Sequence, residues 1–174
     1  MSFKKKAIFL DRDGIINVDH GYVSKIKDFE FTEGIFEILR SLQSQGFLLI
    51  IVTNQSGIGR GYYSEEAYQK LTSYIVESFS KEGIKINAVY HCPHRPDEGC
   101  DCRKPRTGML IAAKKEFDID MHNSWMIGDK NSDMLVGKNA GIKNRILVSA
   151  NETSEEASYS INMIGEIVEI VSGV

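Results

Sequence analysis

The sequence lacks a strong excess of charge, and its 21 basic and 24 acidic residues give a formal net charge of −3. Nucleic acids and anionic membranes are bound by basic surfaces, so neither is expected as a partner. The sequence also lacks an apolar run near the roughly 20 residues of a membrane span. Its first apolar stretch, AIFL at 7–10, is too short for a secretory signal. We therefore expect a cytoplasmic protein.

Cysteine is scarce, and its three copies all lie between positions 92 and 102. In a reducing compartment, so few cysteines indicate metal binding or catalysis rather than a disulfide scaffold. The surrounding segment at 91–105, HCPHRPDEGCDCRKP, adds two histidines and ends with Arg103 and Lys104 before a proline. This pattern favours either a small metal site or a redox loop.

No internal repeat or low-complexity linker interrupts the chain, and its length fits one domain over residues 1–174. Apolar runs at 7–10, 47–53, 88–92, 124–127 and 145–149 are typical of strands buried on both faces. Helical patterns lie around 35–42 and at 64–83, 109–117, 131–140 and 161–172. This alternation predicts an α/β fold with a doubly wound, mostly parallel sheet.

Carboxylates follow two of the expected strands. Asp11 and Asp13 come after the first strand, in LDRDG, and Asp129 follows the fourth, in IGDKNSD. Ligands of doubly wound sheets bind beyond the carboxyl ends of the strands, so these side chains are expected to share one site. Close carboxylates repel each other, and an oxygen-rich site suits Mg²⁺. Asp133 fits equally well behind the metal ligands or as an ordinary helix residue.

The cysteine segment offers four candidate ligands with the pattern C-x-H…C-x-C, which are Cys92, His94, Cys100 and Cys102. Three thiolates and one imidazole match a closed tetrahedral Zn²⁺ site. His91 directly precedes Cys92 and is expected to point away, and free buried cysteines remain the alternative. A closed site has no open position for substrate, so the zinc would be structural and would order Arg103 and Lys104.

Four motifs in order, LDRDG, IVTN, RKP and IGDKNSD, resemble those of the haloacid dehalogenase (HAD) superfamily of phosphotransferases over about residues 7–148. The resemblance implies a Rossmann-like fold and a Mg²⁺-dependent phosphatase, and the short chain leaves little room for a cap domain. Asp11 would be the nucleophile that forms an aspartyl-phosphate, and Asp13 the acid and then the base. Thr53 would hydrogen-bond the phosphoryl group and Lys104 would neutralise it. Mg²⁺ would be bound by Asp11, Asp129 and the backbone carbonyl of Asp13.

The cysteine segment is similar to that of a zinc-bearing branch of the superfamily, which includes heptose bisphosphate phosphatases and histidinol-phosphate phosphatases. The stretches after the first two motifs are similar to those of the heptose bisphosphate phosphatases. This implies a monomeric enzyme that removes the C7 phosphate of D-glycero-D-manno-heptose 1,7-bisphosphate in lipopolysaccharide precursor synthesis. The residues implied to contact this substrate are Asp19, His20, Gly21, Tyr22, Thr53, Asn54, Gln55, Ser56, Arg103, Lys104 and Lys130.

Two other functions stay open at this point. The short loop between His94 and Cys100 is similar to that of histidinol-phosphate phosphatases, although a cationic amino alcohol would favour acidic groups over the basic cluster. A non-catalytic, zinc-organised interaction module is the second alternative, and it would need no nucleophile such as Asp11. Arg60 is a further candidate cation for the second phosphate, but the sequence favours a solvated surface charge at this position.

Overall fold

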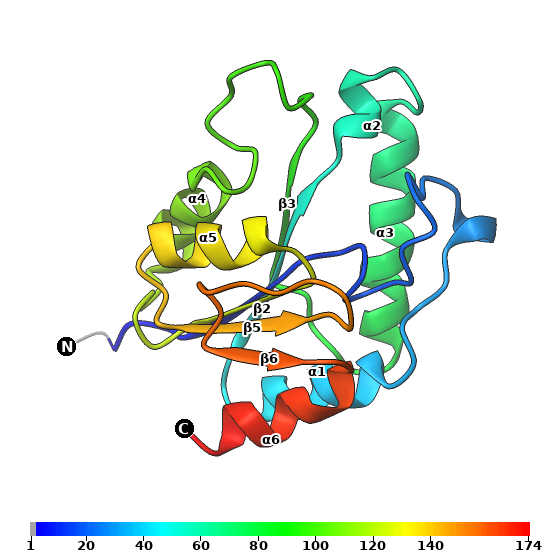
Figure 1. Ribbon diagram of the computed structural model, residues 1–174. Helices are drawn as coiled ribbons and strands as arrows, with labels where there is room; N and C mark the ends of the chain where they lie inside the picture. The colour runs from blue at the N-terminus through cyan, green and yellow to red at the C-terminus, as the bar shows by residue number, and fades with distance from the viewer. Residues whose placement is uncertain (1–2) are drawn as a thin grey trace.

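The computed structural model describes residues 3–174 and contains one sheet whose neighbouring strands are all parallel. The strands are β1 (Ala7–Leu10), β2 (Leu48–Asn54), β3 (Ala88–Cys92), β4 (Trp125–Gly128), β5 (Asn144–Val148) and β6 (Tyr159–Ile161). Their order across the sheet is β3-β2-β1-β4-β5-β6 (Figure 1). The predicted doubly wound α/β fold is confirmed, and β6 is an additional strand at one edge.

Helices connect the strands and cover both faces of the sheet. They are α1 (Ile35–Ser44), α2 (Ser56–Gly59), α3 (Glu65–Lys81), α4 (Gly108–Phe117), α5 (Asn131–Asn139) and α6 (Ile167–Ser172), with 3-10 turns at Ile26–Asp28 and Ile164–Glu166. The hydroxyl of Ser64 accepts a hydrogen bond from the backbone N–H of Ala67 at 3.1 Å, which caps α3. The last helix is shorter than the expected 161–172 span, because the end of β6, a bend and the 3-10 turn at Ile164–Glu166 occupy its first part. Within residues 3–174, no helix is long and apolar enough to cross a bilayer.

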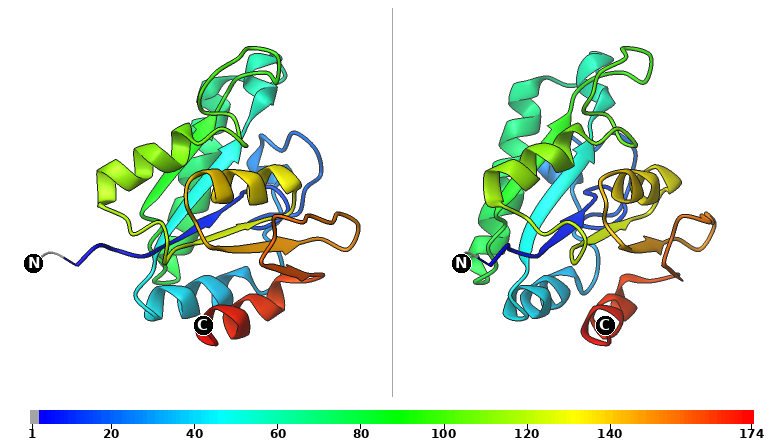
Figure 2. Two further views of the ribbon diagram at one scale, coloured as in Figure 1. Left: turned by 60° about the vertical axis from the view of Figure 1, so that its left-hand side comes forward. Right: turned by 90° about the vertical axis from the view of Figure 1, so that its left-hand side faces the viewer.

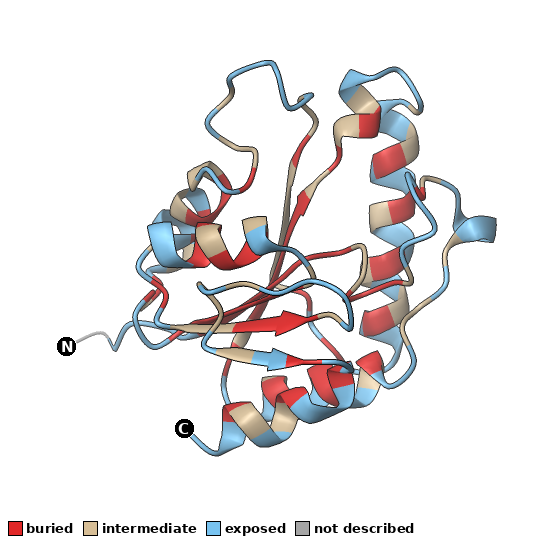
Figure 3. Cartoon of the chain, in the orientation of Figure 1, coloured by how far each residue is buried: buried red, intermediate tan, exposed pale blue. Residues whose placement is uncertain are grey.

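The core has two parts, one on each face of the sheet. Ile8 and Leu10 of β1 pack with residues of α1, α3 and α6, whereas Ala7 and Phe9 pack with residues of α4 and α5. All four side chains are completely buried, because a strand covered on both faces must be apolar at every position. Figure 2 shows α4 and α5 across the sheet from α1 and α6, and Figure 3 shows buried residues along the central strands.

The strand order reverses between β1 and β4. The chain builds β1, β2 and β3 toward one edge and then returns to place β4 on the other side of β1. Leu10 pairs with Ile127, and the backbone N–H of Asp11 donates to the carbonyl of Ile127 at 3.0 Å. A reversal of this kind opens a crevice at the carboxyl ends of the strands. Asp11 and Asp129 therefore leave the sheet side by side.

Candidate active site

A pocket of about 410 Å³ lies at the carboxyl ends of β1, β2 and β4. Most of the predicted site residues line it, namely Asp11, Asp13, Asp19, Gly21, Tyr22, Asn54, Gln55, Ser56, Arg103, Lys104 and Lys130. Thr53 is fully buried beside the pocket, and Asp129 lies next to Asp11. His20 does not line this pocket: its ring lies 2.9 Å from the carboxylate of Glu30, in an adjoining surface hollow that shares Gly21 and Tyr22 with the pocket.

A buried lysine lies between two carboxylates in this pocket. Lys104 Nζ donates to Asp11 Oδ1 at 2.9 Å, to Asp133 Oδ1 at 2.7 Å and to the Val52 carbonyl at 2.9 Å. Its three N–H donors are thereby all used. Burial lowers the pKa of Lys104, but the two carboxylates outweigh burial and raise it above its usual value. The lysine is therefore a fixed positive charge beside Asp11.

Asp133 is a site residue that the sequence left undecided. Its side chain is 1% exposed, and besides Lys104 its carboxylate accepts the backbone N–H of Lys130 at 3.2 Å. Gly128 makes this approach possible, since a Cβ there would lie 2.3 Å from side-chain atoms of Asp133. Asp133 thus lies in the buried wall of the pocket, with its carboxylate bonded to Lys104.

Three carboxylates offer a place for a divalent cation. Oxygens of Asp11, Asp129 and Asp133 lie within 4.8 Å of one another, and Asp129 Oδ1 is buried with no hydrogen-bond partner among residues 3–174. Burial, reinforced by the neighbouring carboxylates, raises the pKa of Asp11 well above its usual value and that of Asp129 to about 6. A cation such as Mg²⁺ would offset this repulsion, so the residues fit the expected metal.

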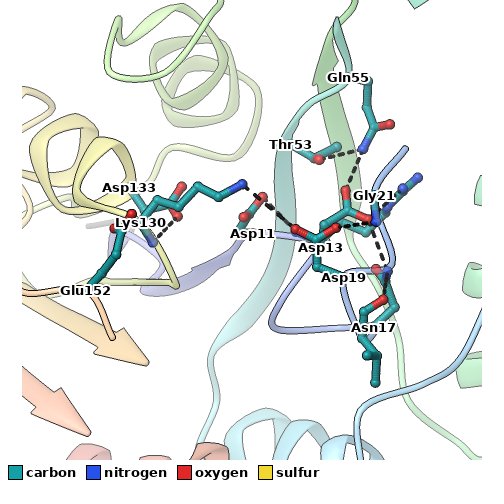
Figure 4. Close-up of polar contacts among 12 residues, drawn as sticks. Asp11, Asp13, Asn17, Asp19, Gly21, Thr53, Gln55, Lys130, Asp133 and Glu152 are labelled. Atoms are coloured by element: carbon teal, nitrogen blue, oxygen red, sulfur yellow. Dashed lines mark hydrogen bonds and ion pairs between the residues drawn. The ribbon is translucent and has the colours of Figure 1, made fainter. Parts of the chain in front are cut away.

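Asp13 is held by three donors. Arg12 Nη2 and Asn17 Nδ2 donate to its Oδ1 at 2.9 and 3.0 Å, and Gln55 Nε2 donates to its Oδ2 at 3.0 Å (Figure 4). Burial raises the pKa of Asp13, but the charge of Arg12 and the three hydrogen bonds outweigh burial and hold that pKa below its usual value. Asp13 therefore has one well-defined position.

The predicted zinc ligands lie together at the end of β3. Cys92 Sγ is 2.8 Å from Cys102 Sγ and 3.5 Å from Cys100 Sγ, and His94 Nδ1 is 3.2 Å from Cys102 Sγ. The three cysteines are free thiols, and all four ligand atoms lie within 4.8 Å of one another. A tetrahedral site with Zn–S bonds of about 2.3 Å has ligand separations of about 3.8 Å. The separations in the structure are shorter than this, so the number and kind of the ligands and their grouping, rather than the distances themselves, suggest a zinc site.

The segment that carries this cluster is fixed to the edge of the pocket. Asn54 Oδ1 accepts the backbone N–H of Lys104 at 3.0 Å, and Asn54 Nδ2 donates to the carbonyl of Lys104 at 3.3 Å. On the other side, the backbone N–H of Gly59 in α2 donates to the Pro93 carbonyl at 2.9 Å. In Figure 1 the segment and α2 both lie beyond the ends of β2 and β3. The side-chain amide of Asn54 therefore holds the main chain of Lys104.

Arg60 extends the set of basic side chains at the pocket. It follows α2 and is exposed, as a solvated surface charge would be. It nevertheless lines the pocket together with Arg103 and Lys130. Arg60 reaches the pocket through the turn that α2 makes after β2, so no local feature of the sequence could decide between a pocket cation and a solvated charge.

Three comparisons relate the chain to known proteins. A sequence model of the family described as HAD-hydrolase-like matches residues 101–168. A D-glycero-alpha-D-manno-heptose-1,7-bisphosphate 7-phosphatase of Campylobacter jejuni is 56% identical over 156 residues, which cover 90% of this chain and 88% of the relative. A D-glycero-beta-D-manno-heptose-1,7-bisphosphate 7-phosphatase of Pasteurella multocida is 44% identical over 180 residues, which cover 97% of this chain and 98% of the relative.

A solved structure supports the same relationship. The D,D-heptose 1,7-bisphosphate phosphatase of B. bronchiseptica, complexed with magnesium and phosphate, superposes with a TM-score of 0.87 at 25% identity. The match covers 97% of this chain and 98% of that structure. By these identities and coverages, the chain belongs to the D-glycero-D-manno-heptose-1,7-bisphosphate 7-phosphatase family of HAD-like hydrolases.

Proposed function

We propose that the protein is a Mg²⁺-dependent phosphatase that removes the C7 phosphate of D-glycero-D-manno-heptose 1,7-bisphosphate. The reaction would supply lipopolysaccharide core precursors, and residues 1–174 would act as one cytoplasmic domain. The observation that carries the proposal is the position of Asp11, which lines the pocket with the buried ammonium group of Lys104 2.9 Å from its carboxylate. The names of relatives that are 56% and 44% identical supply the substrate.

The first half-reaction would transfer the phosphoryl group to Asp11. Its carboxylate oxygen attacks phosphorus, the bond from phosphorus to the C7 oxygen breaks, and the leaving alkoxide takes a proton from Asp13. Asp13 is ionised in the substrate-free site, where Arg12 lowers its pKa. The negative charge of an incoming phosphate ester favours protonation of Asp13 and so prepares the acid.

The second half-reaction would release phosphate and restore Asp11. Asp13, now ionised, takes a proton from water, and the resulting oxygen attacks the phosphorus of the aspartyl-phosphate. Thr53 would donate a hydrogen bond to the phosphoryl oxygens, and Lys104 would balance their charge. Asp11, Asp129 and the backbone carbonyl of Asp13 would hold Mg²⁺. When bound, this cation supplies the charge that lets a phosphate dianion approach a carboxylate.

The remaining pocket residues fit the rest of the substrate. Arg60, Arg103 and Lys130 line one pocket, so a second phosphate can find cations beyond the one beside Asp11. The carboxylate of Asp19 lies 4.0 Å from Lys130 Nζ and, like Ser56, can bond sugar hydroxyls. The zinc ion would be structural, since four protein ligands leave it no open position.

A panel of phosphorylated metabolites tests the proposal. We expect kcat/KM for heptose 1,7-bisphosphate to exceed that for histidinol phosphate by far, with inorganic phosphate released from C7. Asp11→Asn keeps the shape of the side chain and removes the attacking charge, so turnover should fall below a few per cent while the thermal unfolding curve stays cooperative. A preference for histidinol phosphate, or full activity of Asp11→Asn, would contradict the proposal.

A further inference from the structure

Gln55 makes a set of hydrogen bonds that the proposed mechanism does not use. Its side chain is only 3% exposed. Its Nε2 donates to Asp13 Oδ2 at 3.0 Å and to Thr53 Oγ1 at 2.9 Å, as Figure 4 shows. A side-chain amide nitrogen has two hydrogens, so both are engaged by protein groups. The amide nitrogen therefore has no hydrogen left for a sugar hydroxyl.

These two bonds orient both of the groups that Gln55 contacts. Asp13 Oδ2 is held by an N–H, which fixes the carboxyl group on the side of the pocket. Thr53 Oγ1 accepts a hydrogen bond from Gln55, so the hydrogen of its hydroxyl group must point elsewhere and is free to be donated to a phosphoryl oxygen. One amide thus sets the direction of the proposed acid and of the proposed phosphoryl donor.

Gln55 is itself held by a tyrosine. The hydroxyl of Tyr63 donates to Gln55 Oε1 at 2.5 Å. Burial raises the pKa of Tyr63 to about 12, so the hydroxyl keeps its proton at neutral pH. Gly57 makes room for the ring, since a Cβ there would lie 2.2 Å from Tyr63 Cε1. A chain of hydrogen bonds therefore runs from Tyr63 through Gln55 to Asp13.

We infer that Tyr63 is a positioning residue for the proton transfer to the leaving group, and that it acts through Gln55 on Asp13. Without the hydroxyl, Gln55 Oε1 would be buried and unpaired, which is unfavourable. The side chain would then turn toward water and leave Asp13. The inference deepens the proposed phosphatase function and rests on it.

The test compares substrates whose leaving groups differ in their need for a proton. A sugar alkoxide must be protonated as it leaves, whereas p-nitrophenolate leaves as the anion. The parameter kcat/KM reports on the steps up to the first irreversible one, here phosphorylation of Asp11. In Tyr63→Phe we expect kcat/KM for the heptose bisphosphate to fall about tenfold. For p-nitrophenyl phosphate only the part of the loss that comes from the Thr53 hydroxyl should remain, so the fall should be several-fold smaller than for the bisphosphate.

Two further variants complete the design. Gly57→Ala should displace the Tyr63 ring and show the same dependence on the leaving group by a different route. Tyr62→Phe is the matched control: Tyr62 is 60% exposed, and phenylalanine keeps the ring that packs edge-on against Tyr22 at 4.8 Å. This control should behave like the unchanged protein with both substrates.

The outcomes separate the inference from the function on which it rests. If Tyr63→Phe lowered kcat/KM equally for both substrates, Tyr63 would act in substrate binding or in the shape of the loop. If the kinetics of Tyr63→Phe were unchanged, Gln55 would stay in place without the Tyr63 hydroxyl. Either result would overturn the inference alone. If the unchanged protein turned over neither substrate, the proposed function would fail, and the inference with it.

Discussion

The buried triad of Lys104, Asp11 and Asp133 allows a quantitative prediction. Lys104→Met keeps a long side chain but removes the cation between two carboxylates, and neither carboxylate is more than 8% exposed. Removing one partner of a buried ion pair typically costs about 3–5 kcal/mol, because the remaining charge has no compensation. For a domain of this size, each kcal/mol lowers the melting temperature by about 2–4 °C. We therefore expect a decrease of roughly 6–20 °C.

A second variant tests whether the cost arises from the unpaired charge. Asp133→Asn removes one of the two charges that Lys104→Met leaves uncompensated, so the double variant should be more stable than Lys104→Met alone. We expect a coupling energy of at least about 1 kcal/mol, as is usual for residues within one hydrogen-bonded network. Thermal unfolding followed by circular dichroism, at one pH and without added Mg²⁺, gives all four values.

Added Mg²⁺ provides the control. A divalent cation beside Asp11 and Asp129 replaces part of the missing positive charge, so Mg²⁺ should stabilise Lys104→Met more than it stabilises the unchanged protein. A destabilisation below about 1 kcal/mol, or strictly additive losses in the double variant, would refute the reasoning. Either result would mean that the triad is already neutralised by protons.

Three further predictions follow from other parts of the site. Metal analysis should find about one zinc per chain. Cys102→Ser should lose this zinc, and because Arg103 then loses its anchor, the variant should have a lower kcat and a higher KM. Full activity of a zinc-free protein would contradict this prediction. Arg103→Ala should lower kcat/KM for the bisphosphate by roughly ten- to a hundredfold, about 1.4–3 kcal/mol. It should lower kcat/KM for a small monophosphate much less. Equal losses on the two substrates would exclude a role of Arg103 at the second phosphate. Because burial and Asp133 raise the pKa of Asp129 to about 6, a proton competes with the metal at low pH. Calorimetric titration should therefore show Mg²⁺ affinity weakening as the pH falls through about 6, and an affinity that stays constant would contradict the assignment.

Much of the fold could be predicted from the sequence because each of its five longer strands contains a short continuous apolar run. Five strands and the α/β class were predicted in this way, since burial on both faces leaves a continuous signal. The strand β6 has only three residues and α2 only four, and segments this short carry no usable periodicity. Their positions are decided by the packing of the rest of the chain.

The site was predictable where its residues follow strands, and less so where the contacts join distant parts of the chain. Asp133 contacts Lys104, which lies 29 positions earlier in the sequence. No local sequence pattern predicts a contact between residues so far apart. The same holds for Asn54 and Gln55, which the sequence associated with the substrate. In the structure their amides bind Lys104 and Asp13, because a buried amide takes whatever partners the fold brings to it.

The insertion of β4 beside β1 also bears on how the protein reaches its active form. A nascent chain that ends before β4 already contains Asp11, the buried β1 and all four cysteine and histidine ligands, but neither Asp129 nor Asp133. The central strand β1 then has only one neighbour, so half of its backbone pairing is missing. Catalytic competence can begin only when β4 docks in the middle of the sheet. During synthesis or refolding, phosphatase activity should therefore appear when β4 pairs with β1. It should not appear at the earlier stage at which β1, β2 and β3 have formed.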